Sequence, residues 1–324
     1  MRQTIFVASV CTLALVFVFM QRIQPGDPVV FETEHLPELL PHPHEQEDSF
    51  SDPGHHKTLE SPVFIAPRDL YVSDIRFEIV NAPSATLHHA SLIDLSRPNA
   101  TCSNMQGWKE IFVYGSDRMY DNQLTFPENH AVIIPKGTPL KLTFMIHNPK
   151  PPRGPGGIYH DVYSRVVFSE RPGWKFATKE LHPFLLHLDD TDITCGHKEA
   201  DLSDFYTFTI PANTQRFEYT ARGAEDQAAS ISFPRDATIV HLAGHLHGWQ
   251  EGKELYINKD GTRMHTFISR PSSTAPYLYE IRYTSDRFTV KAGERLNIGA
   301  IYENPYPNDA RGAMGIVGFY ATFD

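Results

Sequence analysis

The chain has 324 residues, of which 41% are hydrophobic, enough for about two domains with ordinary cores. Its formal net charge is −10, but residues 26–60 hold nine acidic residues against one lysine, which leaves about −4 over residues 61–324. This part is nearly neutral and has no basic run or glycine-rich phosphate loop. We therefore expect no nucleic acid partner.

The first predicted element is an apolar helix within residues 1–23. Its apolar run, residues 4–20, is 17 residues long, which exceeds a typical signal-peptide core and nears the lower limit for a membrane-spanning helix. Because no small-x-small cleavage site follows, we favour an uncleaved signal anchor over a cleaved signal peptide. Either interpretation predicts that the rest of the chain is extracytoplasmic, and that it is anchored to the membrane by this helix or secreted.

Residues 24–60 form the second predicted element, a disordered linker rich in Pro, His and acidic residues. The segment has few residues that build a core, so we expect it to hold the folded part away from the membrane. Its five histidines, among them His35 and His56, fit either low-affinity metal capture or a solvated linker that carries histidines by chance.

From residue 61 onward, short segments alternate apolar and polar residues between turns rich in Pro, Gly and Asn. No long stretch shows the helical period. The sequence therefore predicts an all-β chain of two tandem β-sandwich domains. We expect the first domain in residues 61–195 and the second in residues 196–324, with the boundary near residues 185–205.

Two pairs of histidines, each followed by a similar strand, are the main signal in this part of the chain. The first pair, His88 and His89, begins 49 residues before Gly137, and a His-Leu-His motif at 245–247 begins 48 residues before Gly293. After both glycines comes an apolar strand that ends in Asn-Pro. Two copies of one β unit, each presenting histidines at the same place, would produce this pattern. The repeat therefore predicts two metal sites.

The second histidine pair has the spacing of a chelating pair on a strand. Residues i and i+2 of a strand point to the same face, so His245 and His247 project together while Leu246 turns to the other face. Met314 opens the last predicted strand, and its thioether is a soft ligand that suits copper, especially Cu(I). Core packing is the alternative role for this methionine.

The first pair of histidines can bind one metal ion only if the backbone departs from a regular strand or if a strand ends there. His88 and His89 are adjacent, so a regular strand would point them to opposite faces. Joint metal binding would require a bulge or a strand end, or one of the two would face the core. His147 ends a strongly apolar strand directly before a turn, which is a poor place for a packing residue. Three histidines suit copper or zinc equally, so spacing alone leaves the metal of this site open.

This ordered set of a His-His pair, His147, a His-x-His pair and Met314 resembles the copper type II, ascorbate-dependent monooxygenases over about residues 61–324. That family includes peptidylglycine α-hydroxylating monooxygenase and dopamine β-monooxygenase. The resemblance implies two jelly-roll-like β domains that face each other across a cleft, with one copper on each.

The resemblance also implies the ligands and the chemistry. The first copper, which transfers electrons, would be held by His88, His89 and His147, and the second copper, which binds O2, by His245, His247 and Met314. With two coppers per chain, and ascorbate or a similar electron donor, one oxygen atom of O2 would be inserted into a C–H bond of the substrate. No catalytic residue beyond the metal ligands is implied.

The chain departs from the family at residues that contact substrate. Where peptide-hydroxylating members carry an arginine two residues before the His-x-His pair, this chain has Ala243. Ile316 and Gly318 stand where the family has an asparagine and a tyrosine, and Met145 replaces a glutamine. Because the arginine, asparagine and tyrosine grip a peptide carboxylate, we expect a small-molecule or peptide substrate other than a glycine-extended peptide.

Other residues leave alternatives open. Cys102 and Cys195 are candidates for a disulfide in an oxidising compartment, and Asn99 lies in a glycosylation sequon that has meaning in a eukaryotic source. His187 is expected at a surface or capping position, and His241 as a supporting partner or an outward residue. The first alternative to an enzyme is a non-catalytic copper-binding or electron-transfer exported protein of the same fold. The second is a surface β module whose histidines bind zinc or no metal.

Overall fold

A computed structural model describes residues 28–41, 56–97, 110–115, 123–148, 156–170, 178–188, 208–220, 229–247, 252–271, 279–280 and 287–323. Within these ranges the chain consists of β-strands and one 3-10 turn, η1 (Ser84–Thr86), which confirms the prediction of an all-β chain. The predicted N-terminal apolar helix lies outside the described residues. In the part of the chain that the structure describes, no helix is long and apolar enough to cross a membrane.

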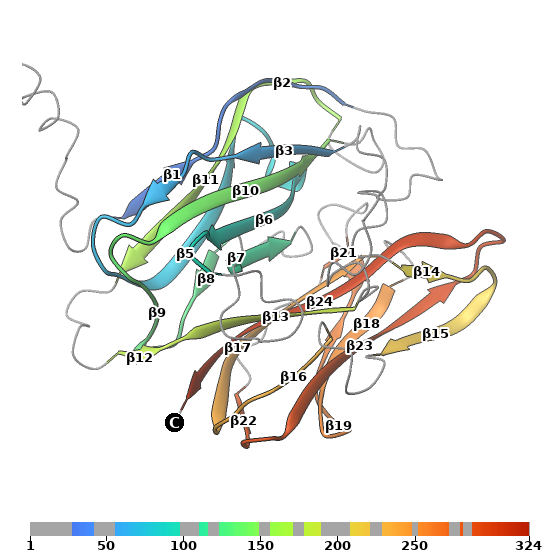
Figure 1. Cartoon of the computed structure of the whole chain (residues 1–324). Coiled ribbons are helices and arrows are strands. Elements are labelled where there is room, and N and C mark those ends of the chain that lie inside the picture. The colour runs from blue at the N-terminus through green and yellow to red at the C-terminus, as the bar shows by residue number, and fades with distance from the viewer. Residues whose placement is uncertain are drawn as a thin grey trace, which may run out of the picture.

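The first unit is built from two sheets (Figure 1). Its strands are β1 (Val29–Glu32), β2 (Leu36–Leu39), β3 (His56–Glu60), β4 (Phe64–Ile65), β5 (Leu70–Val80), β6 (Leu87–Asp94), β7 (Glu110–Gly115), β8 (Gln123–Thr125), β9 (His130–Ile134), β10 (Pro139–His147), β11 (Tyr159–Glu170) and β12 (Lys179–Glu180). One sheet has the order β1-β11-β5-β9-β12, with β2 on β11 and β8 on β5. The other sheet has the order β3-β10-β6-β7, with β4 on β10.

The second unit also has two main sheets. Its strands are β13 (His182–Leu188), β14 (Phe208–Ile210), β15 (Thr214–Thr220), β16 (Ser230–Ser232), β17 (Ala237–His247), β18 (Gly252–Lys259), β19 (Thr262–Ile268), β20 (Arg270–Pro271), β21 (Tyr279–Glu280), β22 (Phe288–Val290), β23 (Arg295–Asn304) and β24 (Ala310–Phe323). One sheet has the order β13-β24-β17-β22, with β14 on β24, and the other has the order β15-β23-β18-β19, with β16 on β23. β20 and β21 form a separate two-stranded ribbon.

The two units share one strand order. The order β1-β11-β5-β9 corresponds to β13-β24-β17-β22, and β3-β10-β6-β7 corresponds to β15-β23-β18-β19. Taken in chain order, this is the strand order of a double-sheet jelly roll. In this correspondence β10 is equivalent to β23, β5 to β17 and β6 to β18.

The segment predicted as a disordered linker contributes strands to the first unit. β1 and β2 pair with β11, and β3 pairs with β10. Val29, Phe31, Leu39 and Leu59 are buried in the core of that unit. The prediction of a linker throughout residues 24–60 is therefore wrong for these strands. Strands of four or five residues bury only alternate side chains, so a segment that contains them can still be polar in overall composition.

The boundary between the units lies before β13 rather than near residue 195. β13 pairs with β24 from His182 to Leu188, and Leu186 is buried in the second core. Leu181, directly before β13, is buried in the first core. An apolar strand carries no mark of the sheet it joins, and this is why the sequence placed β13 in the first domain.

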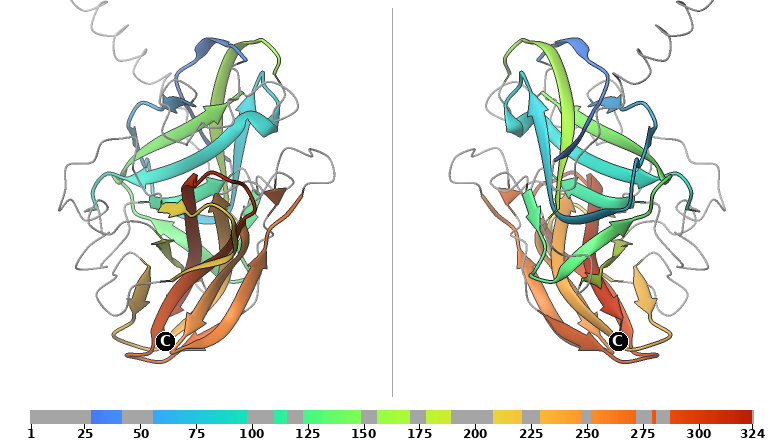
Figure 2. Two further views of the ribbon diagram at one scale, coloured as in Figure 1. Left: turned by 90° about the vertical axis from the view of Figure 1, so that its right-hand side faces the viewer. Right: turned by 90° about the vertical axis from the view of Figure 1, so that its left-hand side faces the viewer.

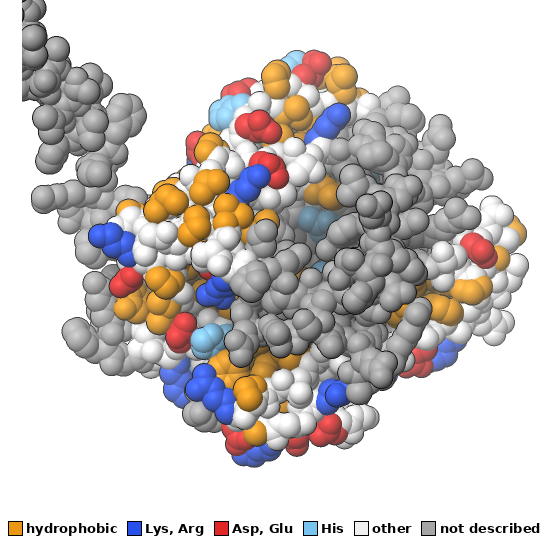
Figure 3. Space-filling view, viewed as in Figure 1, with side chains coloured by type: hydrophobic (Ala, Val, Ile, Leu, Met, Phe, Trp, Pro, Cys, Tyr) orange, Lys and Arg blue, Asp and Glu red, His pale blue; other side chains and the backbone are white. Residues whose placement is uncertain are grey.

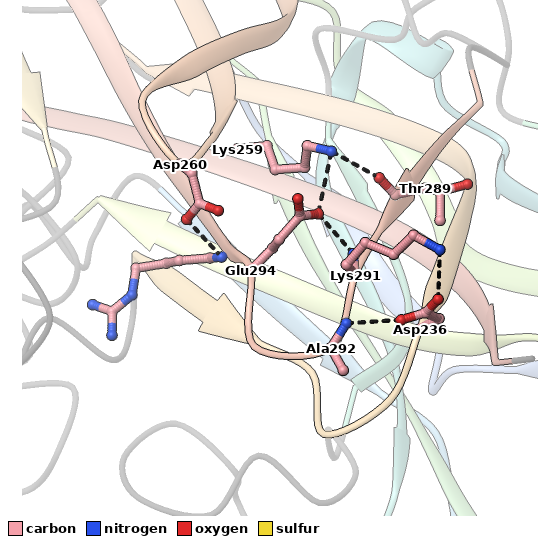
Figure 4. Close-up of polar contacts among 8 residues, drawn as sticks. Asp236, Lys259, Asp260, Thr289, Lys291, Ala292 and Glu294 are labelled. Atoms are coloured by element: carbon pink, nitrogen blue, oxygen red, sulfur yellow. Dashed lines mark hydrogen bonds and ion pairs between the residues drawn. The ribbon is translucent and has the colours of Figure 1, made fainter.

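A glycine turn begins the strand that repeats in both units. Gly137 and Gly293 have φ values of 85° and 82°, in the left-handed region that favours glycine. The amide before each glycine donates to an aspartate carboxylate, Asp69 at 2.8 Å in the first unit and Asp236 at 2.9 Å in the second. Figure 4 shows the second turn, where Lys291 adds an ion pair to Asp236 at 2.7 Å. Both aspartates follow Pro-Arg and precede β5 or β17, so this motif marks equivalent positions of the repeat.

The same strand ends at a buried asparagine in both units. Asn148 and Asn304 are fully buried. The Asn148 amide donates to the Gly157 carbonyl at 2.8 Å, and the Asn304 amide donates to three backbone carbonyls at 2.9, 3.1 and 3.2 Å. These bonds satisfy backbone groups of the adjoining loops, so the Asn of the Asn-Pro pattern has a structural role.

The first unit lies above the second in Figure 1, and the views in Figure 2 agree. The contact joins different sheets of the two jelly rolls. Tyr320 on β24 donates its hydroxyl to the carbonyl of Ile111 on β7 at 3.2 Å. Its ring packs on Phe126, which follows β8, at 4.7 Å between centroids. Tyr320 thus belongs to the second unit by its strand and to the first core by its packing.

Candidate metal centre

The backbone at the first histidine pair is bulged. Met145 on β10 pairs with His89 on β6, and the next residue, Ile146, pairs with Leu87. His88 is therefore the extra residue of a β-bulge. The side chain of His88 lies outside the described residues, but the irregular backbone that joint metal binding would require is present.

His89 and His147 lie on the outer face of their sheet. Along β10, Leu142, Phe144 and Ile146 are buried in the first core, whereas Met145 and His147 are half-buried on the opposite face. Because Met145 pairs with His89, that histidine shares this outer face. β3 brings a further histidine position to the same end of the sheet, since His56 pairs with His147. The sequence interpretation assigned His56 to the linker and missed this neighbour.

The second set lies on β17 and β24. His245 pairs with Ile316, and His247 pairs with Met314, so Met314 is next to the His-x-His pair in the sheet. His245 and Met314 are 9% and 8% exposed. Leu246 packs against the second core on the other face, as the alternation predicts. The side chain of His247 is not among those described, and its position follows from the register alone.

The two histidine-bearing faces meet. His89 Nε2 and His245 Nε2 are 2.8 Å apart, and the two rings lie nearly perpendicular, at 80° with centroids 4.6 Å apart. Figure 3 shows histidine side chains in the recess between the two halves, beside hydrophobic atoms. Among the residues whose side chains are described, no group of three or more His, Cys, Asp or Glu residues could hold a metal ion. The side chains of His88 and His247 are not among those described, and the Met314 thioether is not one of these four residue types.

The histidine pairs do not occupy equivalent places in the two jelly rolls. The first pair lies on β6, whose counterpart is β18, and the second lies on β17, whose counterpart is β5. The expectation that each unit presents its histidines at the same place is therefore wrong. The similar spacing to Gly137 and Gly293 arose although the two pairs sit on different strands. The two units contact each other through non-equivalent sheets. Histidines that meet at this contact must therefore lie on non-equivalent strands.

His241 lies on the same face of β17 and supports the contact. Its ring packs edge-on against Phe126 at 6.4 Å and Tyr320 at 6.1 Å between centroids. It is 2% exposed. The alternative that His241 is an outward residue is wrong, because its side chain is buried between the units.

His187 is a buried histidine that the sequence interpretation placed at the surface. On β13 it pairs with Ile316, so His187 and His245 flank that residue in one row of the sheet. Burial, with a smaller contribution from His245, lowers the pKa of His187 from 6.5 to about 4. A histidine inside the apolar run Phe184–Leu188 was the signal that could have revealed it.

The positions that depart from the family pattern lie together beside His245. Ala243 pairs with Gly318, and His245 pairs with Ile316, on the face turned toward the first unit. A Cβ added at Gly318 would lie 3.3 Å from Leu185, so an aliphatic side chain already covers this position. The surface beside the second histidine set is therefore apolar and carries no charge at these positions.

The remaining predicted positions lie outside the described residues, namely Cys102, Cys195 and Asn99. The donor set of the described residues itself fits copper. Imidazole nitrogen suits Cu(II) and Cu(I), and the Met314 thioether favours Cu(I) and contributes little to Zn²⁺ or Mg²⁺ binding. The Tyr302 hydroxyl donates to the Met314 carbonyl at 3.0 Å and fixes β24 at this point.

Comparisons with known proteins leave the family open. No family model and no curated protein matches the chain. Among solved structures, the chain is similar to PNGF-II, with a TM-score of 0.37 and 11% identity over 90% of this chain and 64% of that one, so it spans less than two thirds of PNGF-II. It is also similar to the major capsid protein P2 from bacteriophage PM2, with a TM-score of 0.34 and 9% identity over 92% of this chain and 98% of that one. A peptide-N(4)-(N-acetyl-β-D-glucosaminyl) asparagine amidase has a TM-score of 0.34 and 10% identity over 91% of this chain and 99% of that one. No function follows from likenesses at this level.

Proposed function

We propose that this protein binds copper at the contact between its two units and acts as a copper-dependent monooxygenase. It would insert one oxygen atom of O2 into a C–H bond with ascorbate or a similar reductant, as a distant relative of the copper type II monooxygenases. The observation that carries the copper-binding part of the proposal is the meeting of His89 and His245, whose Nε2 atoms are 2.8 Å apart although 156 residues separate them in sequence.

The ligands are those that the motif order suggests. The first copper is assigned to His88, His89 and His147, and the second to His245, His247 and Met314. Bound copper would supply the electron transfer and the O2 activation that no amino-acid side chain provides. The pairing of Met314 with His247 and the bulge at His88 support this assignment.

The protein's own residues position the ligands and limit the access of water. His245 and Met314 are more than nine-tenths buried, so charged species at this site have little contact with solvent. The Tyr302 hydroxyl holds the backbone at Met314. His187, kept neutral by burial, lies in the same row as His245 and adds no positive charge there near neutral pH.

The substrate surface beside the second site favours an uncharged group. Ala243, Gly318 and Ile316 offer no donor to a carboxylate, and the Leu185 side chain lies against Gly318. We therefore propose an uncharged C–H substrate, either a small molecule or an apolar part of a peptide. The N-terminal apolar segment would keep the protein extracytoplasmic, anchored at the membrane or secreted.

A second candidate is a non-catalytic copper-binding or electron-transfer protein of the same fold. The contact between His89 and His245 favours it, because imidazoles 2.8 Å apart leave no room for a substrate between them. The monooxygenase requires the units to separate at this point, whereas a copper-binding protein does not.

Copper content and coupled oxygen use test the proposal. When the full chain is incubated with copper and zinc together, it should retain copper. With ascorbate and a substrate that it hydroxylates, the copper-loaded chain should consume O2. Substitution of Met314 by leucine should abolish hydroxylation and leave the first copper bound. Copper uptake without any coupled oxygen use would favour the electron-transfer protein, and zinc uptake with no copper would reject both candidates.

A further inference from the structure

Candidate ligands assigned to different coppers are in direct contact. His89 and His245 meet through their Nε2 atoms at 2.8 Å. In a metal-free contact of this kind, one ring donates its N–H and the other accepts with its lone pair. Both rings therefore turn a metal-binding nitrogen toward the same point between the units.

The separation is that of two ligands on one ion. Metal–imidazole bonds are about 2.0–2.1 Å, so two imidazoles at right-angled to tetrahedral positions on one ion place their nitrogens roughly 2.8–3.4 Å apart. Two separate ions would not fit this arrangement. Each ion would lie about 2 Å in front of its own nitrogen, in the space that the opposite imidazole occupies.

Contacts beside the histidines hold the units together without an ion. Tyr320 spans the contact with its hydrogen bond to Ile111 and its packing on Phe126. His241 fills the space next to it. Because His89 and His245 are already adjacent, binding of an ion between them requires little rearrangement, which lowers the cost of binding.

We propose that His89 and His245 bind a single metal ion between them, which joins the two units, and that a second ion binds only after the two histidines separate. The inference rests on the copper-binding part of the proposed function and adds an order of loading. The singly loaded protein is closed, and the doubly loaded protein, with one ion on each unit, is open at this contact.

The test is a titration of the full chain with Cu(II), followed by calorimetry and by electron paramagnetic resonance of the first equivalent. The wild-type protein should bind one ion tightly and a second more weakly. His89→Ala and His245→Ala should each weaken binding of the first ion at least about 100-fold, since losing a ligand costs more than losing a supporting residue. The double variant should lose the same first ion, and its loss of affinity should be smaller than the sum of the two single losses, because both changes act on one chelated ion.

A matched control is His265→Ala. His265 lies on β19, in the sheet of the second unit that does not face the first, and this variant should bind the first ion as the wild type does. If an alanine variant fails to fold, His89→Gln or His245→Gln replaces it, because glutamine keeps the approximate volume of the side chain.

The possible outcomes separate the two proposals. If each single variant loses a different ion and the double variant loses both, the shared ion is refuted while copper binding stands. If the wild type binds no copper, both proposals fail. Loss of the same first ion in either single variant, with a loss of affinity in the double variant that is smaller than the sum of the two, supports the shared ion.

Discussion

Protonation of His187 should make the metal-free protein markedly less stable in acid. Its pKa is about 4 in the folded state against an ordinary value of 6.5, so between these values the unfolded chain holds a proton that the folded chain lacks. Stability from this group is therefore fully present above pH 6.5 and is lost as the pH falls toward 4. At 1.36 kcal/mol for each pKa unit, the loss over this window amounts to about 3 kcal/mol.

The assay is urea unfolding of the metal-free wild type and of His187→Leu across this pH window. The free energy of unfolding of the wild type should fall by about 3 kcal/mol more than that of the variant, because leucine does not titrate. Equal pH dependence in the wild type and His187→Leu would refute the reasoning that burial keeps His187 neutral.

Three further predictions concern packing, and each is measured by chemical denaturation against the wild type. Tyr320→Phe removes the hydrogen bond to Ile111 across the unit contact and should cost about 1–2 kcal/mol; no change would mean that the bond is absent in solution. Asn304→Ala removes three hydrogen bonds from a fully buried side chain and should cost about 2–4 kcal/mol, and a cost near zero would contradict a structural role. Gly299→Ala would place a Cβ in steric conflict with the Tyr256 hydroxyl and should cost about 1–3 kcal/mol, whereas an unchanged midpoint of unfolding would show that the ring moves aside freely.

The sequence by itself predicted features that depend on local pattern. Period-two alternation and the absence of a helical period predicted an all-β chain. The His-x-His spacing predicted that His245 and His247 share one face of a strand while Leu246 turns into the core. The structure agrees for Leu246, which packs against the second core. The sequence also indicated that joint metal binding by His88 and His89 would need a bulge or a strand end, or that one of the two would face the core. Of these alternatives, the structure has the bulge.

The markers of the repeat were all present in the sequence, but only some of them were recognised. The glycine turn was recognised in both copies, but the aspartates that bind these turns, Asp69 and Asp236, each follow Pro-Arg far upstream of them. Aligning the histidine pairs instead shifted the two copies by one strand. Short strands such as β1 and β3 were missed because four or five residues, half of them polar, do not stand out in composition.

The tertiary structure alone decided which residues meet. Nothing in the spacing of His89 and His245 indicates a contact, since it depends on which sheet of the first jelly roll packs against which sheet of the second. The burial of His187 depends in the same way on β13 joining the second unit rather than the first. Strand patterns record which face of a strand is apolar, but the choice of partner sheet depends on the fit of whole surfaces. That fit exists only once both units have folded.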